Sequence, residues 1–208
     1  MLKGNLMFGQ SGGPTSVINC SAAGVFIEAL KHEDRIEKVY GAHHGIVGVL
    51  EEDFFDMGQE DEAELLLLKQ TPSSALGSCR YKLANPEEDD TDYKRILEVF
   101  KKYNIRYFFY NGGNDSMDTC NKISKFIQEN GYECRVIGVP KTIDNDLYGT
   151  DFCPGFPSAA RYIATTMMEV YCDSVVYSNG QITIVEIMGR NAGWLTAASV
   201  LASHEGYG

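Results

Sequence analysis

The sequence predicts an α/β fold in which a mostly parallel sheet is covered by helices. Strand-like and helix-like segments alternate along the 208 residues, as they do in chains built from βαβ units. Residues 106–110 form an aromatic-rich run that is typical of a strand buried on both faces. Distinctive polar and glycine-containing loops follow the predicted strands, at the edge where ligands bind in such folds.

Each element follows from hydrophobic spacing and turn residues. Apolar residues at helical spacing mark the helices, and short apolar runs that end in glycine or polar loops mark the strands. The strands are expected at 6–8, 39–41, 106–110, 136–139 and 182–187. The helices are expected at about 16–30, 90–103, after 116 to about 129, at about 157–171 and from about 192 onward. The acidic stretch 51–62 is expected to be solvated.

Composition and charge exclude several classes of function. Hydrophobic residues make up 44% and charged residues 23% of the chain, which are ordinary values for a globular domain. The net charge of −11 opposes nucleic acid as a partner, because such binding needs a basic face. No apolar run reaches the length of about 18 residues that a spanning helix needs, and no signal peptide is recognised. We therefore expect no membrane partner and a cytoplasmic protein.

Two loops combine paired glycines with the start of a helix. The first covers residues 12–16 and the second covers residues 112–116. Paired glycines let the backbone approach a phosphate closely, and the following helix offers free N–H groups. The alternative for the first loop is a tight turn. The alternative for the second is that Asp115 or Ser116 caps its helix.

The loop at 141–146 carries a lysine and two aspartates. Asp144 and Asp146 could share a site in an extended segment, one as a base and the other as a metal ligand. Lys141 could neutralise a transferring phosphoryl group. The alternative is a polar turn with a surface lysine.

Two arginines complete the candidate residues. Arg190 follows the strand expected at 182–187, where its planar guanidinium could bind phosphate through paired hydrogen bonds. An arginine at such a place is also a common surface ion-pair partner. Arg80 lies in a loop-like region and by itself indicates little.

In this order the motifs resemble those of the phosphofructokinase family. The matching segments are Gly12-Gly13-Pro14, Leu76-Gly77-Ser78-Cys79-Arg80, Gly112-Gly113-Asn114-Asp115-Ser116, Pro140-Lys141-Thr142-Ile143-Asp144-Asn145-Asp146 and Met188-Gly189-Arg190. The resemblance implies parallel sheet layers covered by helices. It also implies a phosphoryl-donor domain at 1–138 and the first part of a fructose 6-phosphate domain at 139–208. Because family members run well beyond 300 residues, the chain is expected to represent about the N-terminal half.

The resemblance also implies a role for each motif residue. Asp144 would accept the proton of the sugar 1-hydroxyl. The catalytic set comprises Asp144, Thr142, Lys141 and Arg190. The donor-binding set comprises Gly12, Gly13, Arg80, Gly113, Asp115 and Ser116. The sugar-phosphate set comprises Thr142, Asp144, Met188, Gly189 and Arg190. The expected cofactor is Mg²⁺, held by Asn114, Asp115 and Asp146.

The second glycine loop bears on the identity of the phosphoryl donor. In this family the loop reads GGDGS in ATP users and GGDDS in pyrophosphate users, whereas here it reads GGNDS. Asp115 stands where ATP users have glycine, and so does Lys141. Both residues favour pyrophosphate, while Asn114 replaces the expected metal-side aspartate.

The resemblance leaves three alternatives to a pyrophosphate-dependent enzyme. They are an ATP-dependent 6-phosphofructokinase, a non-catalytic regulatory subunit of the same type, and a lipid or NAD kinase, which shares only the GGDG-type loop. The expected partners are fructose 6-phosphate, pyrophosphate or ATP, and further copies of the chain in a full-length homo-oligomer. Gln181 stands where ATP-type bacterial enzymes have an arginine that reaches a neighbouring subunit, so that contact is not carried over.

Overall fold

A computed structural model describes residues 2–15 and 17–203 of the chain. The chain forms two compact units, Met1–Lys141 and Thr142–Gly208. This division falls close to the domain boundary predicted between residues 138 and 139. The assignment of donor and sugar phosphate to the two domains stays a prediction.

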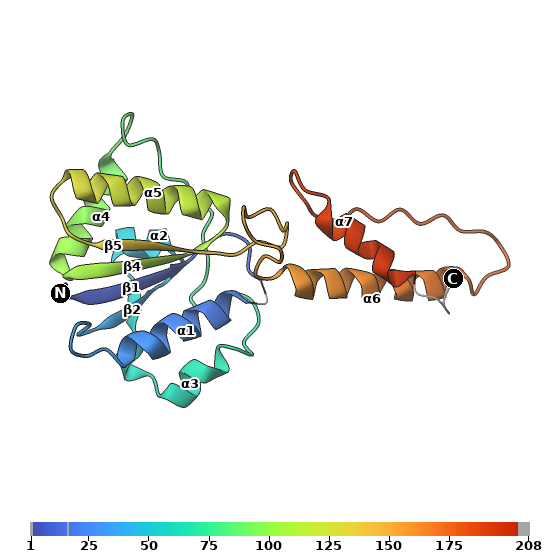
Figure 1. Ribbon diagram of the computed structural model, residues 1–208, viewed down its shortest axis with the longest axis horizontal. Coiled ribbons are helices and arrows are strands. Elements are labelled where there is room, and N and C mark those ends of the chain that lie inside the picture. Colours follow the sequence, from blue (N-terminus) through green and yellow to red (C-terminus); the bar gives the residue numbers. More distant parts are fainter. Residues whose placement is uncertain (1, 16, 204–208) are drawn as a thin grey trace. The chain divides into compact units, whose positions relative to one another are not determined.

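The first unit is built on a five-stranded sheet with the order β3-β2-β1-β4-β5. Its strands are β1 (Asn5–Gln10), β2 (Val39–Ala42), β3 (Phe54–Asp56), β4 (Ile105–Gly112) and β5 (Arg135–Pro140). All neighbours pair in parallel except β3, which runs antiparallel to β2. Gln10 pairs with Asn111, and Gly112 pairs with Pro140. The loops that follow β1, β4 and β5 therefore start at one edge of the sheet (Figure 1).

Helices cover both faces of this sheet (Figure 1). The helices on one face are α1 (Ile18–Leu30) and α3 (Glu62–Leu67). Those on the other are α2 (Ile46–Glu51), α4 (Thr91–Lys102) and α5 (Asn114–Glu129). Successive residues of a strand point to opposite faces, so Phe8 packs with Phe26 of α1 while Met7 joins the core under α4 and α5. Each fully buried large apolar side chain contributes about 1.5–3 kcal/mol.

The acidic stretch 51–62 is largely exposed, as expected, but it also contains regular structure. It contains β3 and a short 3₁₀ helix, η1 (Met57–Gln59), and Met57 is buried. Glu52 receives hydrogen bonds from Arg95, Lys102 and Tyr103. Phe54 and Met57 supply the apolar contacts that attach this otherwise exposed segment to the core, and cations pair with Glu52.

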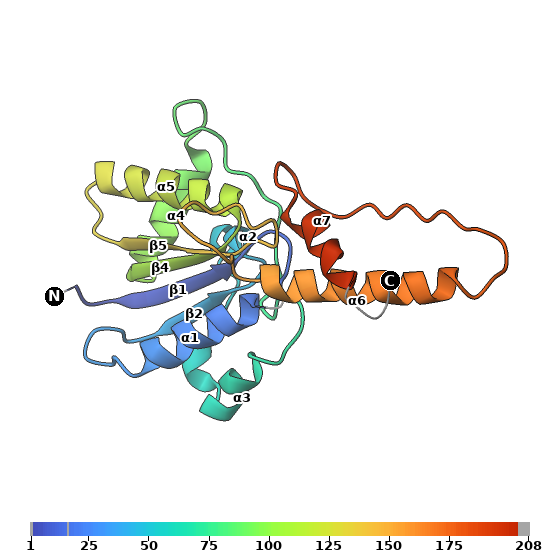
Figure 2. The same cartoon turned by 45° about the vertical axis from the view of Figure 1, so that its right-hand side comes forward.

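The second unit has a small core between helices. α6 (Phe156–Ser174) packs against α7 (Trp194–Ala198) and the 3₁₀ helix η2 (Ser199–Ala202), as Figure 2 shows. The buried apolar residues of this core are Cys153, Phe156, Ala160, Leu195 and Ala198. Tyr171, near the end of α6, is 50% exposed, because the core covers only the first half of this helix.

The strand expected at 182–187 does not form. Residues 179–189 have no regular secondary structure, and the side chains of Ile182 and Ile184 are each 92% exposed. The apolar run has the composition of a buried strand, but no strand within the described residues pairs with it. In the part of the chain that the structure describes, no helix combines the length and apolar character that crossing a membrane requires.

Candidate phosphate-binding and catalytic site

Three loops of the first unit come together at the carboxyl edge of its sheet. The Gly12-Gly13 turn follows β1, and the Lys141 side chain, which is 5% exposed, donates a hydrogen bond to the Gly13 carbonyl. Gly12 has a φ of +74°, and a side chain placed on it would lie 3.4 Å from Lys141 Nζ. Glycine is favoured at this position because its φ lies in the left-handed region, which L side chains rarely adopt.

The loop that carries Arg80 is held against the same glycine turn. Ser78 donates from Oγ to the Gly12 carbonyl at 2.6 Å, and the Gly12 amide donates to the Cys79 carbonyl at 3.3 Å. A side chain on Gly13 would lie 3.9 Å from an Arg80 guanidinium nitrogen. The structure thus brings three residues of the predicted donor-binding set, Gly12, Gly13 and Arg80, close to Lys141 of the predicted catalytic set. Their role in donor binding stays a prediction.

Electrostatics make this cluster receptive to an anion. Burial lowers the pKa of Lys141 below its ordinary value, and the neighbouring Arg80 charge lowers it further. A phosphate group placed between the two cations would offset both effects, because an opposite charge favours the protonated amine. The arrangement can therefore bind and neutralise phosphate oxygens.

The glycine loop after β4 has a tighter geometry than the first. A Cβ on Gly112 would overlap the Ser116 side chain, so the buried hydroxymethyl group of Ser116 lies directly against the glycine. Gly113 is the N-cap of α5 and no side chain caps the helix. The alternative in which Asp115 or Ser116 is the cap is therefore wrong, because both residues lie within the first turn. The N–H groups of such a turn are available to an anion.

The predicted magnesium ligands fit a metal that arrives with its phosphates. Asn114 and Asp115 are exposed and lie in the same helical turn, where they offer amide and carboxylate oxygens. Among the described residues, no three His, Cys, Asp or Glu side chains gather into a group that could hold a metal alone. Mg²⁺ needs no such group, since it commonly uses one or two carboxylates, water and substrate phosphates. Asp146 is exposed and belongs to the second unit.

The second unit begins with the segment that holds the candidate base. The Asp144 amide donates to Thr142 Oγ1 at 3.0 Å, which forms a local turn. Asn145 has a φ of 57°, and its side chain binds the backbone of Asp151 and Cys153. The expectation of an extended segment is therefore wrong, since the chain bends at Asn145 between the two aspartates. Asp144 is half-buried and Asp146 is exposed.

The structure places the last motif in an irregular segment. Met188 and Arg190 are exposed and do not follow a strand, since the expected strand is not formed. A Cβ on Gly189 would lie 2.5 Å from the Ala192 carbonyl oxygen, so the turn after Met188 requires glycine. The local turn is thus well defined, while the proposed contacts of these three residues with sugar phosphate stay predictions.

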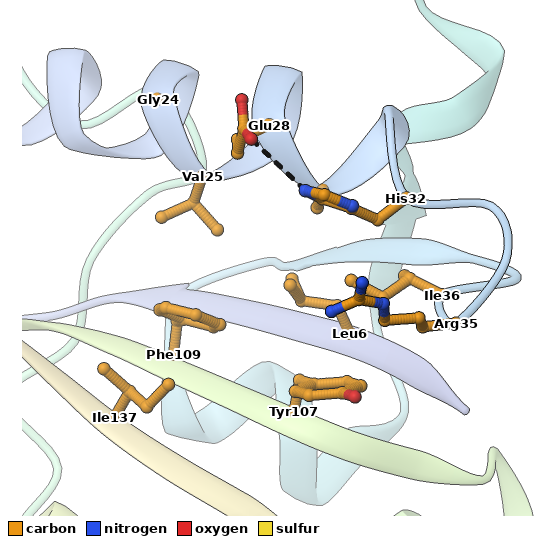
Figure 3. Close-up of a pocket in the computed structure, with 11 residues that line it drawn as sticks. Leu6, Gly24, Val25, Glu28, His32, Arg35, Ile36, Tyr107, Phe109 and Ile137 are labelled. Carbon is orange, nitrogen blue, oxygen red and sulfur yellow. Dashed lines mark hydrogen bonds and ion pairs between the residues drawn. The ribbon is translucent and has the colours of Figure 1, made fainter. Parts of the chain in front are cut away.

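A pocket of about 450 Å³ lies elsewhere in the first unit. It lies between one side of α1 and the sheet, and its apolar sheet side includes Leu6, Tyr107 and Phe109 (Figure 3). Glu28 and His32 lie on its helix side, joined by a hydrogen bond of 3.2 Å. None of the predicted site residues lines this pocket, so it is separate from the phosphate-binding cluster.

Sequence reasoning missed the polar residues that support the cluster. Ser78 lies within one of the family motifs, two residues before Arg80, but its spacing did not indicate that it would donate a hydrogen bond to the Gly12 carbonyl. Gln10 and Asn19 are buried polar residues at the end of β1 and the start of α1. The sequence signal that could have found Asn19 is an amide side chain on the otherwise apolar face of the helix expected at about 16–30.

Fold and cluster together define an α/β phosphate-binding protein with glycine loops at the carboxyl ends of parallel strands. Residues 5–206 match the family model described as Phosphofructokinase. The chain belongs to the phosphofructokinase family.

Individual relatives agree with this family. The chain is 50% identical over 204 residues to a pyrophosphate–fructose 6-phosphate 1-phosphotransferase of Halomonas elongata, covering 97% of the chain and 49% of the relative. It is 34% identical to an ATP-dependent 6-phosphofructokinase of Actinobacillus pleuropneumoniae over 194 residues, covering 93% of the chain and 55% of the relative. The crystal structure of a pyrophosphate-dependent phosphofructokinase from Marinobacter aquaeolei matches with a TM-score of 0.87 and 47% identity, covering 97% of the chain and 50% of that structure. The chain spans about half the length of these relatives.

Proposed function

We propose that the protein is a 6-phosphofructokinase that transfers a phosphoryl group from pyrophosphate to the 1-hydroxyl of fructose 6-phosphate. The observation that carries the proposal is the placement of Lys141 and Arg80 against the Gly12-Gly13 turn. This cluster offers two cations and close backbone approach, which suit a small, highly charged donor. The names of the relatives at about 50% identity support the same donor.

The donor side of the proposed reaction needs charge neutralisation. As the bond to the leaving phosphate breaks, negative charge grows on its oxygens. Lys141 and Arg80 would stabilise that charge, and a buried cation such as Lys141, held by the Gly13 carbonyl, needs little reorganisation during the reaction. Asn114, Asp115 and Asp146 are the proposed ligands of Mg²⁺, which would supply further neutralisation of phosphate charge when bound.

The acceptor side of the proposed reaction needs a base and residues that bind the sugar phosphate. Asp144 would accept the proton of the 1-hydroxyl as that oxygen attacks the phosphorus. The turn in which its amide bonds Thr142 Oγ1 restrains the backbone at this position. Met188, Gly189 and Arg190 would bind fructose 6-phosphate, with the guanidinium on phosphate oxygens.

An ATP-dependent enzyme is the second candidate. The relative from Actinobacillus pleuropneumoniae supports it, at the lower identity of 34%. ATP needs room for an α-phosphate, ribose and adenine beyond the β-phosphate. Asp115 adds a carboxylate where ATP users have glycine, and Lys141 adds a cation that suits pyrophosphate as donor. A non-catalytic subunit is less well supported, because Asp144, Asp146 and Arg190 are all present.

A donor comparison tests the proposal. The assay uses a protein of the relatives' length that carries this sequence, called the full-length protein below. Fructose 1,6-bisphosphate formation is measured with pyrophosphate and with ATP at equal concentration. Faster turnover with pyrophosphate is expected, and a preference for ATP would replace the proposal with the second candidate. A cytoplasmic location and a homo-oligomeric state stay predictions, testable by fractionation and light scattering.

A further inference from the structure

A buried polar layer lies beneath the phosphate-binding cluster of the first unit. It contains Gln10, the last residue of β1, and Asn19, in the first turn of α1. Both side chains are almost completely removed from water. Buried amides are costly unless all their hydrogen-bonding groups find partners, so their partners reveal what the layer stabilises.

Gln10 joins the end of β1 to the nearby start of α1 and to a loop 64 to 66 residues further along the chain. Its Nε2 donates to Asn19 Oδ1 at 2.9 Å and lies 3.3 Å from the Ile18 carbonyl oxygen. Its Oε1 accepts hydrogen bonds from Ser74 Oγ at 2.7 Å and from the Leu76 amide at 3.0 Å. The end of β1 is thereby tied to the start of α1 and to the loop at 71–80.

Asn19 binds the same loop at two further points. Its Oδ1 accepts a hydrogen bond from the Ala75 amide at 2.9 Å, and its Nδ2 donates to the Thr71 carbonyl at 2.8 Å. Residues 71–80 contain no helix or strand, so their backbone groups depend on outside partners. Two side chains, Gln10 and Asn19, supply many of these partners.

The loop held in this way is the one that carries Ser78 and Arg80. Ser78 binds the Gly12 carbonyl, and Arg80 lies beside Gly13 and Lys141. We propose that Gln10 and Asn19 are positioning residues for the phosphoryl donor, because they fix the 71–80 loop so that Arg80 faces the glycine turn. This inference rests on the proposed function, since it assigns the donor to that cluster.

The network predicts an effect confined to one substrate. Its hydrogen bonds reach the donor loops of the first unit and none of the predicted sugar-phosphate residues. Loosening the loop should therefore raise KM for the donor and leave KM for fructose 6-phosphate within about twofold. Removing one partner of a buried hydrogen bond costs enough free energy to change an equilibrium constant by about tenfold or more.

The test compares three variants of the full-length protein. Asn19→Ala removes the two side-chain hydrogen bonds that hold the backbone of Thr71 and Ala75. Ser74→Ala is milder, because it removes one hydroxyl, which lies 2.7 Å from Gln10 Oε1 and 2.6 Å from the Gly77 carbonyl oxygen of the same loop. It stays informative if Asn19→Ala fails to fold. Tyr132→Phe is the matched control, because it deletes a buried hydroxyl that contacts the carbonyls of Phe100 and Ile105 at 2.8 Å, at the opposite end of β4.

Both KM values, kcat and the melting temperature are measured for each variant. We expect donor KM to rise about tenfold or more in Asn19→Ala and severalfold in Ser74→Ala, with no selective change in Tyr132→Phe. Equal rises in both KM values, an unchanged donor KM in a folded variant, or the same donor effect in Tyr132→Phe would overturn the inference. If the wild type prefers ATP, the proposed function fails, and the positioning role is tested in the same way with ATP as donor.

Discussion

The two units of this chain differ in how completely they bury their own apolar side chains. In the first unit, strands with neighbours on both sides and helices on both faces bury large aromatic side chains such as Phe8, Phe100 and Phe108. In the second unit, apolar side chains remain in water over a long stretch. Val176, Tyr177, Ile182 and Ile184 are each at least 68% exposed.

This difference separates two kinds of candidate site. The donor cluster is fixed by hydrogen bonds within one unit, from Lys141 to Gly13 and from Ser78 to Gly12. The sugar-phosphate residues are supported only locally, by the turn at Thr142 and the tight turn at Gly189. A preformed cluster can bind its ligand with little rearrangement, whereas exposed side chains such as Met188 and Arg190 lose conformational freedom when they bind.

The largest expected effect comes from the second unit. Asp144→Asn keeps the size of the side chain and removes its ability to take a proton. Turnover of the full-length protein should fall by roughly 10²–10⁴. Binding of fructose 6-phosphate and the melting temperature should change little. Steady-state kinetics and calorimetry measure both, and near-normal turnover would remove Asp144 from the role of base.

A smaller effect is expected from the donor cluster. Lys141→Met keeps most of the buried side-chain volume and removes the charge. KM for pyrophosphate should rise by about 10–100-fold, as for loss of a hydrogen bond to a charged group. The melting temperature should not fall, because the lowered pKa of Lys141 shows that burial disfavours its charge. A destabilised variant with an unchanged KM would show that Lys141 is structural.

The pKa of Lys141 also predicts a pH dependence. Its protonated form binds pyrophosphate, and burial together with Arg80 lowers its pKa below 10.5. Pyrophosphate affinity should therefore weaken as pH rises through this lowered pKa, before an exposed lysine would lose its proton. Titration calorimetry across alkaline pH measures this, and Lys141→Met should lack that step.

Exposed apolar residues predict the behaviour of the 208-residue chain by itself. Apolar patches beyond several hundred Å² promote association, so this chain should aggregate and show no measurable kinase activity. Replacing Ile182 and Ile184 together by serine should reduce the association seen by light scattering. Thr183→Ala, in the same exposed segment, serves as the control. A monodisperse chain with measurable turnover would contradict the contrast between the units.

The smallest expected effect concerns stability within the first unit. Hydrogen bonds from Lys102, Tyr103 and Arg95 lower the pKa of Glu52 from 4.5 to about 2. A lowered carboxyl pKa stabilises the folded state above pH 4.5, and that contribution is lost as pH falls toward 2.

Glu52→Gln should therefore destabilise the protein at pH 7, and its difference from wild type should shrink between pH 4.5 and 2. Urea unfolding at several pH values measures this. Glu98→Gln is the control, because Glu98 pairs with the same Arg95 on the exposed surface. A difference that stays constant with pH would show that the Glu52 contacts do not act through its charge.

Hydrophobic spacing predicted the longer helices and the parallel strands of the first unit because those elements bury their own apolar faces. It missed three short elements, α2, β3 and α3. The helix expected at 90–103 is α4, with Tyr93, Ile96 and Phe100 buried as its spacing indicated. The same reasoning failed at 182–187, because a strand also needs a partner and composition does not reveal one. Paired glycines indicated the phosphate loops, but the hydrogen bonds of Gln10 and Asn19 join segments whose proximity only the fold creates.

The donor assignment is tested most directly by changing Asp115 and Lys141 to the glycines of ATP users. Like charges about 4 Å apart repel by about 1 kcal/mol in water and about 4 kcal/mol at an effective dielectric near 20. The larger value would exclude a donor whose α-phosphate lies near Asp115. The full-length wild type, Asp115→Gly and the Asp115→Gly/Lys141→Gly variant are assayed with pyrophosphate and ATP at equal concentration. We predict that ATP turnover appears or rises with Asp115→Gly and that pyrophosphate turnover falls in the double variant. A wild type that prefers ATP, or a donor ratio that neither change alters, would contradict the account.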